Sequence, residues 1–397
     1  MKAYIILVGT ELLNSPMLET NSLYMTEELN KIGIDLVGKL IVPDKISDIV
    51  EAMNFTKTKS DILILSGGLG PTIDDLTKDA ISEFLCEKLV VDEFHRKEME
   101  RKFSERNIPV LEKNIKEVMV LENSIVFHNE KGIAPPFYKD GIVAFPGVPS
   151  ELKNTFPKFI NYILKNFNIE KNIYIRDLLV FDIPESILEE KIINIFQKKS
   201  ISLEFLVKNY GIIIRLIGTE NDKVEMKECI EKVSAILGDN LVSTKGNKIE
   251  EELLKKLNFL KYNIKLAESC TGGLITSTLV SLAGVSGVLQ EGLVTYSNQS
   301  KIERLGVKEE TLEKYGAVSE ECVKEMLLGL DSDTAIAVSG IAGPEGGTAD
   351  KPVGTIYIGT RVKEKIKIKK YKLQGDRERI RIRTSYTALF NLLNMLP

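Results

Sequence analysis

Asp61-Ile62-Leu63-Ile64-Leu65-Ser66-Gly67-Gly68 is a short apolar run that ends in two glycines. Its length and its aliphatic residues predict a buried β-strand, and residues 78–85 after it have the apolar spacing of a helix. Further strands are predicted at 4–8 and 141–145, and a helix at 21–31. Strands that alternate with helices indicate a parallel sheet with helices on both faces, so the predicted fold class is α/β.

Two further domains are predicted after this first one, which we place at residues 1–168. Residues 169–246 should form a small α+β domain, with strands at 174–181 and 211–217 and helices at 185–196 and 224–237. This segment contains no G-x-x-G, the loop with which KH domains clamp RNA.

Residues 247–397 return to an α/β pattern. Its predicted strands are 264–267, 292–295, 334–338 and 354–358. The lysine-rich run 362–372 is interpreted as an edge strand whose charges discourage pairing between sheets.

Composition limits the classes of function. The 397 residues are 43% hydrophobic and 28% charged, as in soluble globular proteins, and the net charge of −4 argues against binding to nucleic acid. The four cysteines show no zinc-site or disulfide spacing, which favours the reducing cytoplasm. The uncharged stretch 269–290 is long enough to span a bilayer, but its Gly, Ser and Thr content favours a buried helix, so we expect no membrane partner.

The residues after the first apolar strand suggest a phosphate site. In the run 66–78, glycine amides and a helix N-terminus are suited to a phosphate, and Asp74 and Asp75 are suited to a divalent cation such as Mg, Mn or Co. The alternative is a glycine turn in which Asp74 or Asp75 caps the helix.

The third domain contains no histidine, so a nucleophile in Ala267-Glu268-Ser269-Cys270-Thr271-Gly272-Gly273 needs another base. Lys301 is the candidate, because Ser297 is a suitable N-cap and the helix dipole near the first turn disfavours a lysine proton. Backbone N–H groups at the start of a helix opening at 271–273 are expected to hold an oxyanion or a phosphate. The alternatives are that Ser269 or Thr271 only caps this helix and that Lys301 lies on the surface.

Two more glycine-bearing loops, 339–347 after a predicted strand and 351–355 before the next one, suggest one pocket shared with the loop 267–273. Arg377 and Arg381 lie four residues apart at the start of the last helix and share a face. They either bind a ligand phosphate or decorate a solvated helix.

Residues 9–13, 20–22, 66–78 and 145–151 together resemble the molybdopterin-binding domain of the CinA (competence- and damage-inducible protein A) family. The resemblance implies a three-layer fold and metal-dependent cleavage of ADP-ribose to AMP and ribose 5-phosphate. It implies a metal at Asp74 and Asp75 and substrate contacts from Glu11, Asn21, Ser66, Gly67, Gly68, Gly70 and Thr72. Ile133 and Pro136 depart from the family pattern, and Pro136 lacks an N–H donor.

Residues 267–273, 296–301, 340–347 and 351–355 resemble the C-terminal domain of the same family, which is similar to nicotinamide-nucleotide amidohydrolases. The resemblance implies conversion of nicotinamide mononucleotide to nicotinic acid mononucleotide and ammonia without a cofactor. Ser269 is the implied nucleophile, Lys301 its base and Tyr296 a proton-relay or orienting group. The expected substrate contacts are Thr271, Gly272, Gly340, Arg377 and Arg381.

The middle segment resembles the KH-type linker domain of that family. The sequence thus predicts a cytoplasmic, homodimeric enzyme of pyridine-nucleotide salvage, with small nucleotides as its only partners. A non-catalytic adaptor connected with competence or DNA damage, and a molybdopterin-handling protein, are the alternatives.

Overall fold

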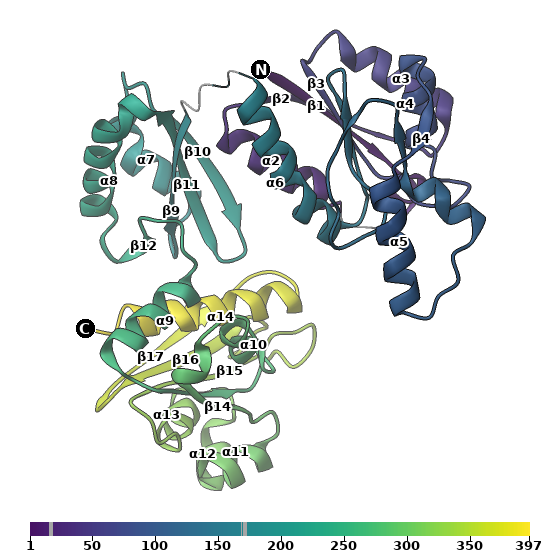
Figure 1. The fold of residues 1–397 in the computed structure, drawn as a ribbon. Coiled ribbons are helices and arrows are strands. Elements are labelled where there is room, and N and C mark those ends of the chain that lie inside the picture. Colours follow the sequence, from purple (N-terminus) through teal and green to yellow (C-terminus); the bar gives the residue numbers. More distant parts are fainter. Residues whose placement is uncertain (16–18, 168, 170–172) are drawn as a thin grey trace. The chain divides into compact units, whose positions relative to one another are not determined.

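A computed structural model describes residues 1–15, 19–167, 169 and 173–397. The chain divides into two compact units, Met1–Ile173 and Tyr174–Pro397, which are described separately (Figure 1). Part of the predicted boundary at 168–169, residue 168, lies outside the described residues, as do residues 170–172 of the neighbouring linker. The division into three domains stays a prediction.

The first unit contains a six-stranded sheet in the order β2-β1-β3-β8-β7-β6 and a separate pair, β4 and β5. Its strands are β1 (Lys2–Val8), β2 (Asp35–Val42), β3 (Ile62–Ser66), β4 (Leu89–Val91), β5 (Met119–Leu121), β6 (Ile125–Val126), β7 (Phe137–Lys139) and β8 (Ile142–Phe145). Its helices are α1 (Thr10–Asn14), α2 (Asn21–Lys31), α3 (Ile46–Lys57), α4 (Thr77–Leu85), α5 (Glu93–Glu105), the 3₁₀ helix η1 (Glu112–Val118) and α6 (Pro149–Asn166).

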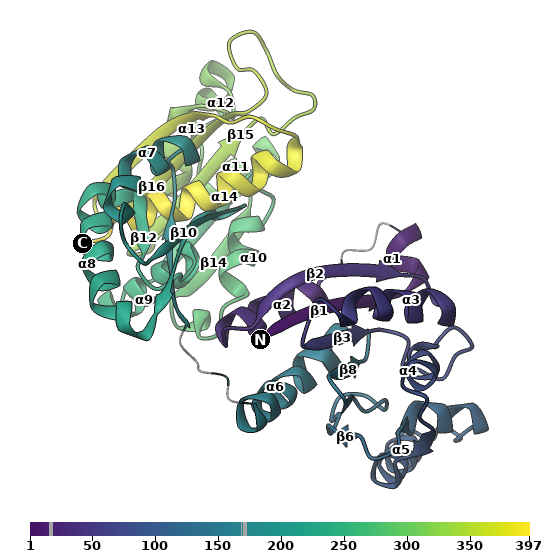
Figure 2. The same ribbon diagram turned by 90° about the horizontal axis from the view of Figure 1, so that it is seen from above.

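The parallel part of this sheet consists of β2, β1, β3 and β8, while β7 and β6 pair antiparallel. Alternate residues of β1 face two cores: Ile6 packs with α3 and α4, and Ile5 packs with α2 and α6. The unit therefore has three layers, and Figure 2 shows it from a second side. Strands β1, β3 and β8 end at the same edge, where Ser66, Gly67 and Gly147 lie.

The second unit contains two sheets. The first has the order β10-β11-β9-β12 and consists of β9 (Ile173–Val180), β10 (Ser202–Lys208), β11 (Gly211–Thr219) and β12 (Leu241–Ser243). Its helices are α7 (Glu185–Phe196) and α8 (Lys223–Leu237), with the 3₁₀ helices η2 (Glu220–Asp222) and η3 (Gly238–Asn240). Leu188 of α7 and Met226 of α8 pack with Ile214 of β11 in one core. This is the α+β arrangement that the sequence predicted for residues 169–246.

The second sheet of this unit has the order β14-β13-β15-β16-β17. Its strands are β13 (Ile264–Glu268), β14 (Leu289–Val294), β15 (Thr334–Gly340), β16 (Thr355–Val362) and β17 (Lys365–Lys372). Its helices are α9 (Ile249–Leu260), α10 (Leu274–Val280), the 3₁₀ helix η4 (Val285–Gly287), α11 (Asn298–Leu305), α12 (Glu309–Tyr315), α13 (Glu320–Leu328) and α14 (Arg377–Leu393).

Strands β14, β13 and β15 are parallel, and β16 and β17 are antiparallel. Helices α9, α10 and α14 cover one face, where Leu266 is buried, and α13 covers the other, where Ala267 is buried. The lysine-rich β17 is an edge strand, as predicted. The carboxyl ends of the three parallel strands bring Ser269, Tyr296 and Gly340 to one edge.

One helix prediction was wrong. Residues 269–290 do not form a single buried helix, because α10 has only 7 residues and is followed by η4 and the start of β14. Gly284, the N-cap of η4, has a φ of 84°, a left-handed conformation that a continuous α-helix through this segment could not contain. Among the described residues, no helix is both long and apolar enough to cross a membrane.

Two candidate active sites

Ser269 lies directly after β13, in the turn that leads to α10. Its backbone N–H donates to the carbonyl of Val338 on β15 at 3.1 Å, and its side chain is buried, with 8% of the residue exposed. Its Oγ lies 3.2 Å from Nζ of Lys301, a residue 32 positions later in the chain. The two segments that the sequence analysis identified therefore meet at one point.

Lys301 is 1% exposed and belongs to α11, whose N-cap is Ser297, as predicted. Its Nζ donates to the carbonyls of Thr295 at 2.7 Å and Tyr296 at 3.1 Å. Burial lowers the pKa of Lys301. A neutral amine has two N–H protons and one lone pair, so the two carbonyls accept both protons and the lone pair is left for the hydroxyl of Ser269. The geometry fits a neutral lysine that accepts a proton.

A cavity of about 190 Å³ opens in front of this pair. Its lining residues are Ser269, Cys270, Tyr296, Lys301, Ala317, Val318, Ser339, Gly340, Ala342 and Arg377. Loops 267–273 and 339–347 and the segment 296–301 thus contribute to one cavity, whereas the lining includes no residue of the loop 351–355. Thr271, Gly272 and Arg381 lie beside this cavity but do not line it.

The start of α10 differs from the expectation. The helix begins at Leu274 with Gly273 as its N-cap, and neither Ser269 nor Thr271 caps it. The buried carboxylate of Glu268 instead accepts hydrogen bonds from three backbone N–H groups, those of residues 273, 275 and 276. These N–H groups are therefore not free to hold an oxyanion or a phosphate, because an internal carboxylate already uses them.

Tyr296 and the two arginines have separate positions. The side chain of Tyr296 is 62% exposed, and its hydroxyl accepts a hydrogen bond from Arg377 at 3.4 Å. Arg377 also donates to the carbonyl of Gly343 at 2.7 Å and lines the cavity. Arg381 donates to the carbonyl of Thr271 from Nε at 3.2 Å and from Nη2 at 2.8 Å. Only the backbone carbonyl of Tyr296 reaches Lys301, so the proton-relay role of its hydroxyl stays a prediction.

Cys270 lines the cavity but is 6% exposed. Burial, with a smaller contribution from the charge of Glu268, raises the pKa of its thiol to about 12. A thiol with so high a pKa is protonated at neutral pH and is a poor nucleophile, so the environment disfavours Cys270 in comparison with Ser269.

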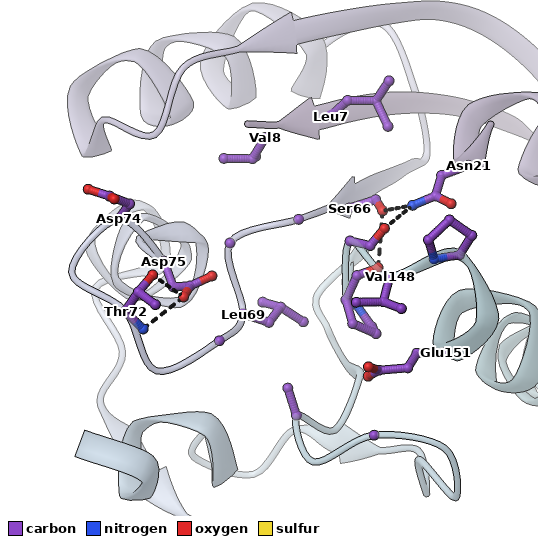
Figure 3. A pocket seen from close by; sticks show the side chains of 18 of the residues that line it. Leu7, Val8, Asn21, Ser66, Leu69, Thr72, Asp74, Asp75, Val148 and Glu151 are labelled. Carbon is purple, nitrogen blue, oxygen red and sulfur yellow. Dashed lines mark hydrogen bonds between the residues drawn. The ribbon is translucent and has the colours of Figure 1, made fainter. Parts of the chain in front are cut away.

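The first unit contains the larger pocket, of about 940 Å³. Every residue predicted to contact substrate in this unit lines it: Glu11, Asn21, Ser66, Gly67, Gly68, Gly70 and Thr72. Figure 3 shows Asn21 and Ser66 on one side and Asp74 and Asp75 on the other. Ile133 also lines the pocket, whereas Pro136 is buried and is not among the lining residues.

Asn21 and Ser66 connect the elements of the pocket. Nδ2 of Asn21 donates to Oγ of Ser66 at 3.2 Å and to the carbonyl of Gly147 at 2.7 Å (Figure 3). Gly67 has a φ of 110°, and a Cβ there would lie 2.1 Å from the carbonyl oxygen of Val8. Only glycine fits this left-handed position beside β1, which accounts for the first glycine of the motif.

Asp75 and Asp74 differ in their surroundings. Oδ2 of Asp75 accepts hydrogen bonds from the backbone N–H of Thr72 at 2.8 Å and from its hydroxyl at 2.6 Å (Figure 3). Asp74 is exposed, and neither aspartate caps α4, whose N-cap is Leu76. Within the described ranges, no group of three His, Cys, Asp or Glu side chains is arranged to hold a metal by itself. Two carboxylates fit a cation that shares its other ligands with substrate phosphates, as Mg²⁺ commonly does.

Two lysines that the sequence analysis did not identify, the buried Lys78 and the half-buried Lys102, donate to backbone carbonyls beside the pocket. Nζ of Lys78 donates to the carbonyls of Lys116 at 3.0 Å and Glu117 at 2.7 Å. Nζ of Lys102 donates to three carbonyls in residues 129–132, the nearest being that of Gly132 at 2.7 Å. Lys78 stands inside the motif 66–78, but nothing in the local pattern indicated that its side chain is buried.

Glu117 and Glu151 are acidic side chains that also line the pocket. Burial raises the pKa of Glu117. Glu151 belongs to the motif 145–151, and its Oε2 accepts a hydrogen bond from Nδ2 of Asn129 at 2.7 Å.

Family models match both units of the chain. A model of the CinA C-terminal domain matches residues 246–396, and a model of a probable molybdopterin binding domain matches residues 4–166. The solved structure of the competence/damage inducible protein CihA from Agrobacterium tumefaciens is 38% identical, with a TM-score of 0.36, and covers 37% of this chain and 93% of its own.

Relatives match this chain over almost its whole length. A CinA-like protein of Fusobacterium nucleatum is 47% identical over 398 residues, covering 100% of this chain and 99% of its own. A putative competence-damage inducible protein of Caldicellulosiruptor saccharolyticus is 37% identical over 402 residues and covers 98% of each chain. Identity of this extent over both units shows that the chain belongs to the CinA family.

Proposed function

We propose that the second unit is a nicotinamide-nucleotide amidase, which hydrolyses nicotinamide mononucleotide to nicotinic acid mononucleotide and ammonia. The observation that supports it best is the buried pair of Ser269 and Lys301, with 3.2 Å between Oγ and Nζ. A cavity of about 190 Å³ is smaller than most pockets that enclose a whole ligand. It suits the pyridine carboxamide, with the phosphate held at the rim near Arg377.

The reaction follows from this pair. Lys301 accepts the hydroxyl proton of Ser269 while Oγ bonds to the amide carbon, giving a tetrahedral intermediate. Its collapse breaks the C–N bond, and the proton on Lys301 passes to the leaving nitrogen, which departs as ammonia. Water then adds to the acyl-serine with Lys301 as base, the ester bond breaks, and the proton on Lys301 returns to Oγ of Ser269. The carboxylic acid leaves and loses its remaining proton to solvent.

The oxyanion in this scheme needs hydrogen-bond donors. The N–H groups of residues 273, 275 and 276 are bound to Glu268. Among the described residues, the N–H groups of Cys270 and Thr271 donate to no backbone carbonyl. They are the candidate donors in this turn.

We also propose that the first unit is a metal-dependent ADP-ribose pyrophosphatase. Its pocket is rich in carboxylates, and in the described part of the chain two cationic side chains line it. The acidic residues are Glu11, Glu19, Asp44, Asp74, Asp75, Glu117 and Glu151, and the cationic ones are Arg106 and Lys131. A diphosphate entering this pocket would be repelled unless cations accompany it.

Asp74 and Asp75 would hold the cation, which offsets the charge of the phosphates. The amides of Gly68 and Gly70 would contact a phosphate at the end of β3. The N–H of Gly67 donates instead to the carbonyl of Phe145 at 3.0 Å.

One experiment tests both proposals. The purified full chain is incubated separately with nicotinamide mononucleotide and with ADP-ribose, each with and without Mg²⁺, Mn²⁺ or Co²⁺, and ammonia and AMP are measured. Ammonia release independent of metal and AMP release dependent on metal are expected. Turnover of neither substrate would favour the adaptor. The cytoplasmic location, the homodimer and the lack of nucleic-acid partners stay predictions.

A further inference from the structure

Glu268 is a fully buried carboxylate next to the nucleophile, and the proposed chemistry gives it no role. It is 0% exposed and ends β13 directly before Ser269. Burying a charged group is costly unless hydrogen bonds replace the lost water. This one is compensated by donors from the segment that follows Ser269.

Four donors surround the carboxylate. Oε2 accepts from the N–H groups of Gly273 at 3.1 Å and Ile275 at 3.0 Å. Oε1 accepts from the N–H of Thr276 at 2.8 Å and from its hydroxyl at 2.7 Å. Each oxygen thus accepts two hydrogen bonds, and the side chain of Glu268 spans the turn that contains Ser269.

The same residue also supports the base. The backbone carbonyl of Glu268 accepts the N–H of Thr295 at 2.8 Å. The carbonyl of Thr295 in turn accepts Nζ of Lys301 at 2.7 Å. Glu268 therefore contacts both the turn that carries the nucleophile and the segment that orients the base.

Gly272 and Gly273, within the spanned turn, have φ values of 61° and 90°. This left-handed pair lets the chain fold back so that three N–H groups point at one carboxylate, as in a backbone nest. The carboxylate of Glu268 occupies the site where these N–H groups would otherwise bind the anion of a ligand.

We propose that Glu268 is the positioning residue of the nucleophile: its carboxylate fixes the 269–273 turn so that Oγ of Ser269 stays within reach of Nζ of Lys301. This inference rests on the proposed amidase function. It adds a residue that acts through Ser269 and touches neither the substrate nor the reacting atoms.

Glu268→Gln tests the proposal. Glutamine has nearly the same shape, but one of its two oxygens becomes an NH₂ that faces N–H donors. In a folded protein we expect kcat for nicotinamide mononucleotide to fall at least about 100-fold with KM within about threefold, since ground-state binding is retained. The matched control is Glu250→Gln, which changes a buried glutamate in the first turn of α9 and is expected to leave both constants unchanged.

A second readout does not depend on the substrate. A fluorophosphonate probe forms a bond between its phosphorus and Oγ of an activated serine and releases fluoride, and mass spectrometry locates the label. Glu268→Gln is expected to slow labelling at Ser269 by a similar factor, and Ser269→Ala is the blank. If the wild type is labelled but does not turn over nicotinamide mononucleotide, the proposed substrate is wrong. The labelling rates of the wild type and Glu268→Gln would still test the positioning role of Glu268.

Two milder variants decide the matter if Glu268→Gln does not fold. Thr276→Val removes one of the four donors, and Thr276→Ser retains the hydroxyl. We expect labelling about fivefold slower in the first and unchanged in the second. Unchanged labelling in Thr276→Val, wild-type rates in folded Glu268→Gln, or a wild-type Ser269 that does not react at all would overturn the proposal.

Discussion

Nζ of Lys301 lies 3.2 Å from Oγ of Ser269, and both side chains are buried. The two carbonyls that accept from Lys301 belong to Thr295 and Tyr296, directly before its own helix. This setting lowers the pKa of Lys301, because burial disfavours its charge and, among the described residues, no carboxylate is hydrogen-bonded to it. The predictions for the second unit follow from this pair.

Ser269→Ala and Lys301→Ala are each expected to abolish deamidation, whereas Cys270→Ser should retain most of it. The thiol of Cys270 has a pKa of about 12 and is protonated at neutral pH. Ammonia release by the three variants is the measurement. If Ser269→Ala remains active and Cys270→Ser is inactive, Cys270 is the nucleophile.

The amidase rate should increase with pH. Lys301 acts as a base only when deprotonated, and burial places its pKa below the ordinary 10.5. kcat/KM is therefore expected to rise through that lowered pKa and to level off below pH 10.5. Lys301→Arg, which keeps its charge at every accessible pH, should be inactive throughout. A wild-type rate that falls between about pH 7 and about pH 9 would be incompatible with a lysine base.

Arg377 and Arg381 should have different kinetic effects, in contrast to the equal roles that the sequence suggested. Arg377 lines the cavity, so Arg377→Ala should raise KM for nicotinamide mononucleotide by about tenfold to 100-fold. Arg381 holds the carbonyl of Thr271, so Arg381→Ala should lower kcat more than it raises KM. Steady-state kinetics of both variants checks this. If Arg381→Ala raises KM more than it lowers kcat, Arg381 binds the substrate phosphate instead.

Cleavage of ADP-ribose should require the charge of Asp75. Asp75→Asn keeps an oxygen that accepts both hydrogen bonds from Thr72 but removes the negative charge. Loss of AMP release in Asp75→Asn, and after addition of a chelator, is expected while deamidation is spared. Asp79→Asn, a nearby aspartate paired with Lys116 outside the pocket lining, is the control. Equal loss of both activities would contradict two independent sites.

Lys78 should make the stability of the first unit depend on pH. Burial lowers its pKa from 10.5 to about 7, so between these values the unfolded chain binds more protons than the folded one. Stability therefore rises with pH across this window, as the cost of burying the charge is relieved. Lys78→Met removes the titrating group, so its thermal midpoint should rise less than that of the wild type between about pH 6.5 and about pH 9. If the thermal midpoints of the wild type and of Lys78→Met change equally with pH, the titration of Lys78 does not contribute to stability.

Much of the fold followed from local pattern. The apolar runs that became β1, β3, β8, β13 and β15 were predicted, and the bounds of α2 and α7 agree with the predicted ranges. Periodicity and capping chemistry act over one or two turns, so they can be read without the rest of the chain. The edge strand β2 was missed. Its residues alternate regularly between exposed and half-buried, but Gly38 and Lys39 interrupt the apolar residues of its sequence.

The sequence alone determined the α/β class, the family resemblance and the residue types available for chemistry, including the need for a base other than histidine. Tertiary structure decided which groups are free to act. It buried Lys301 against Ser269, turned Glu268 onto the amides that were expected to hold a ligand, and directed Arg381 to a backbone carbonyl. Burial and hydrogen-bond partners depend on packing between segments far apart in the chain, which no local pattern encodes.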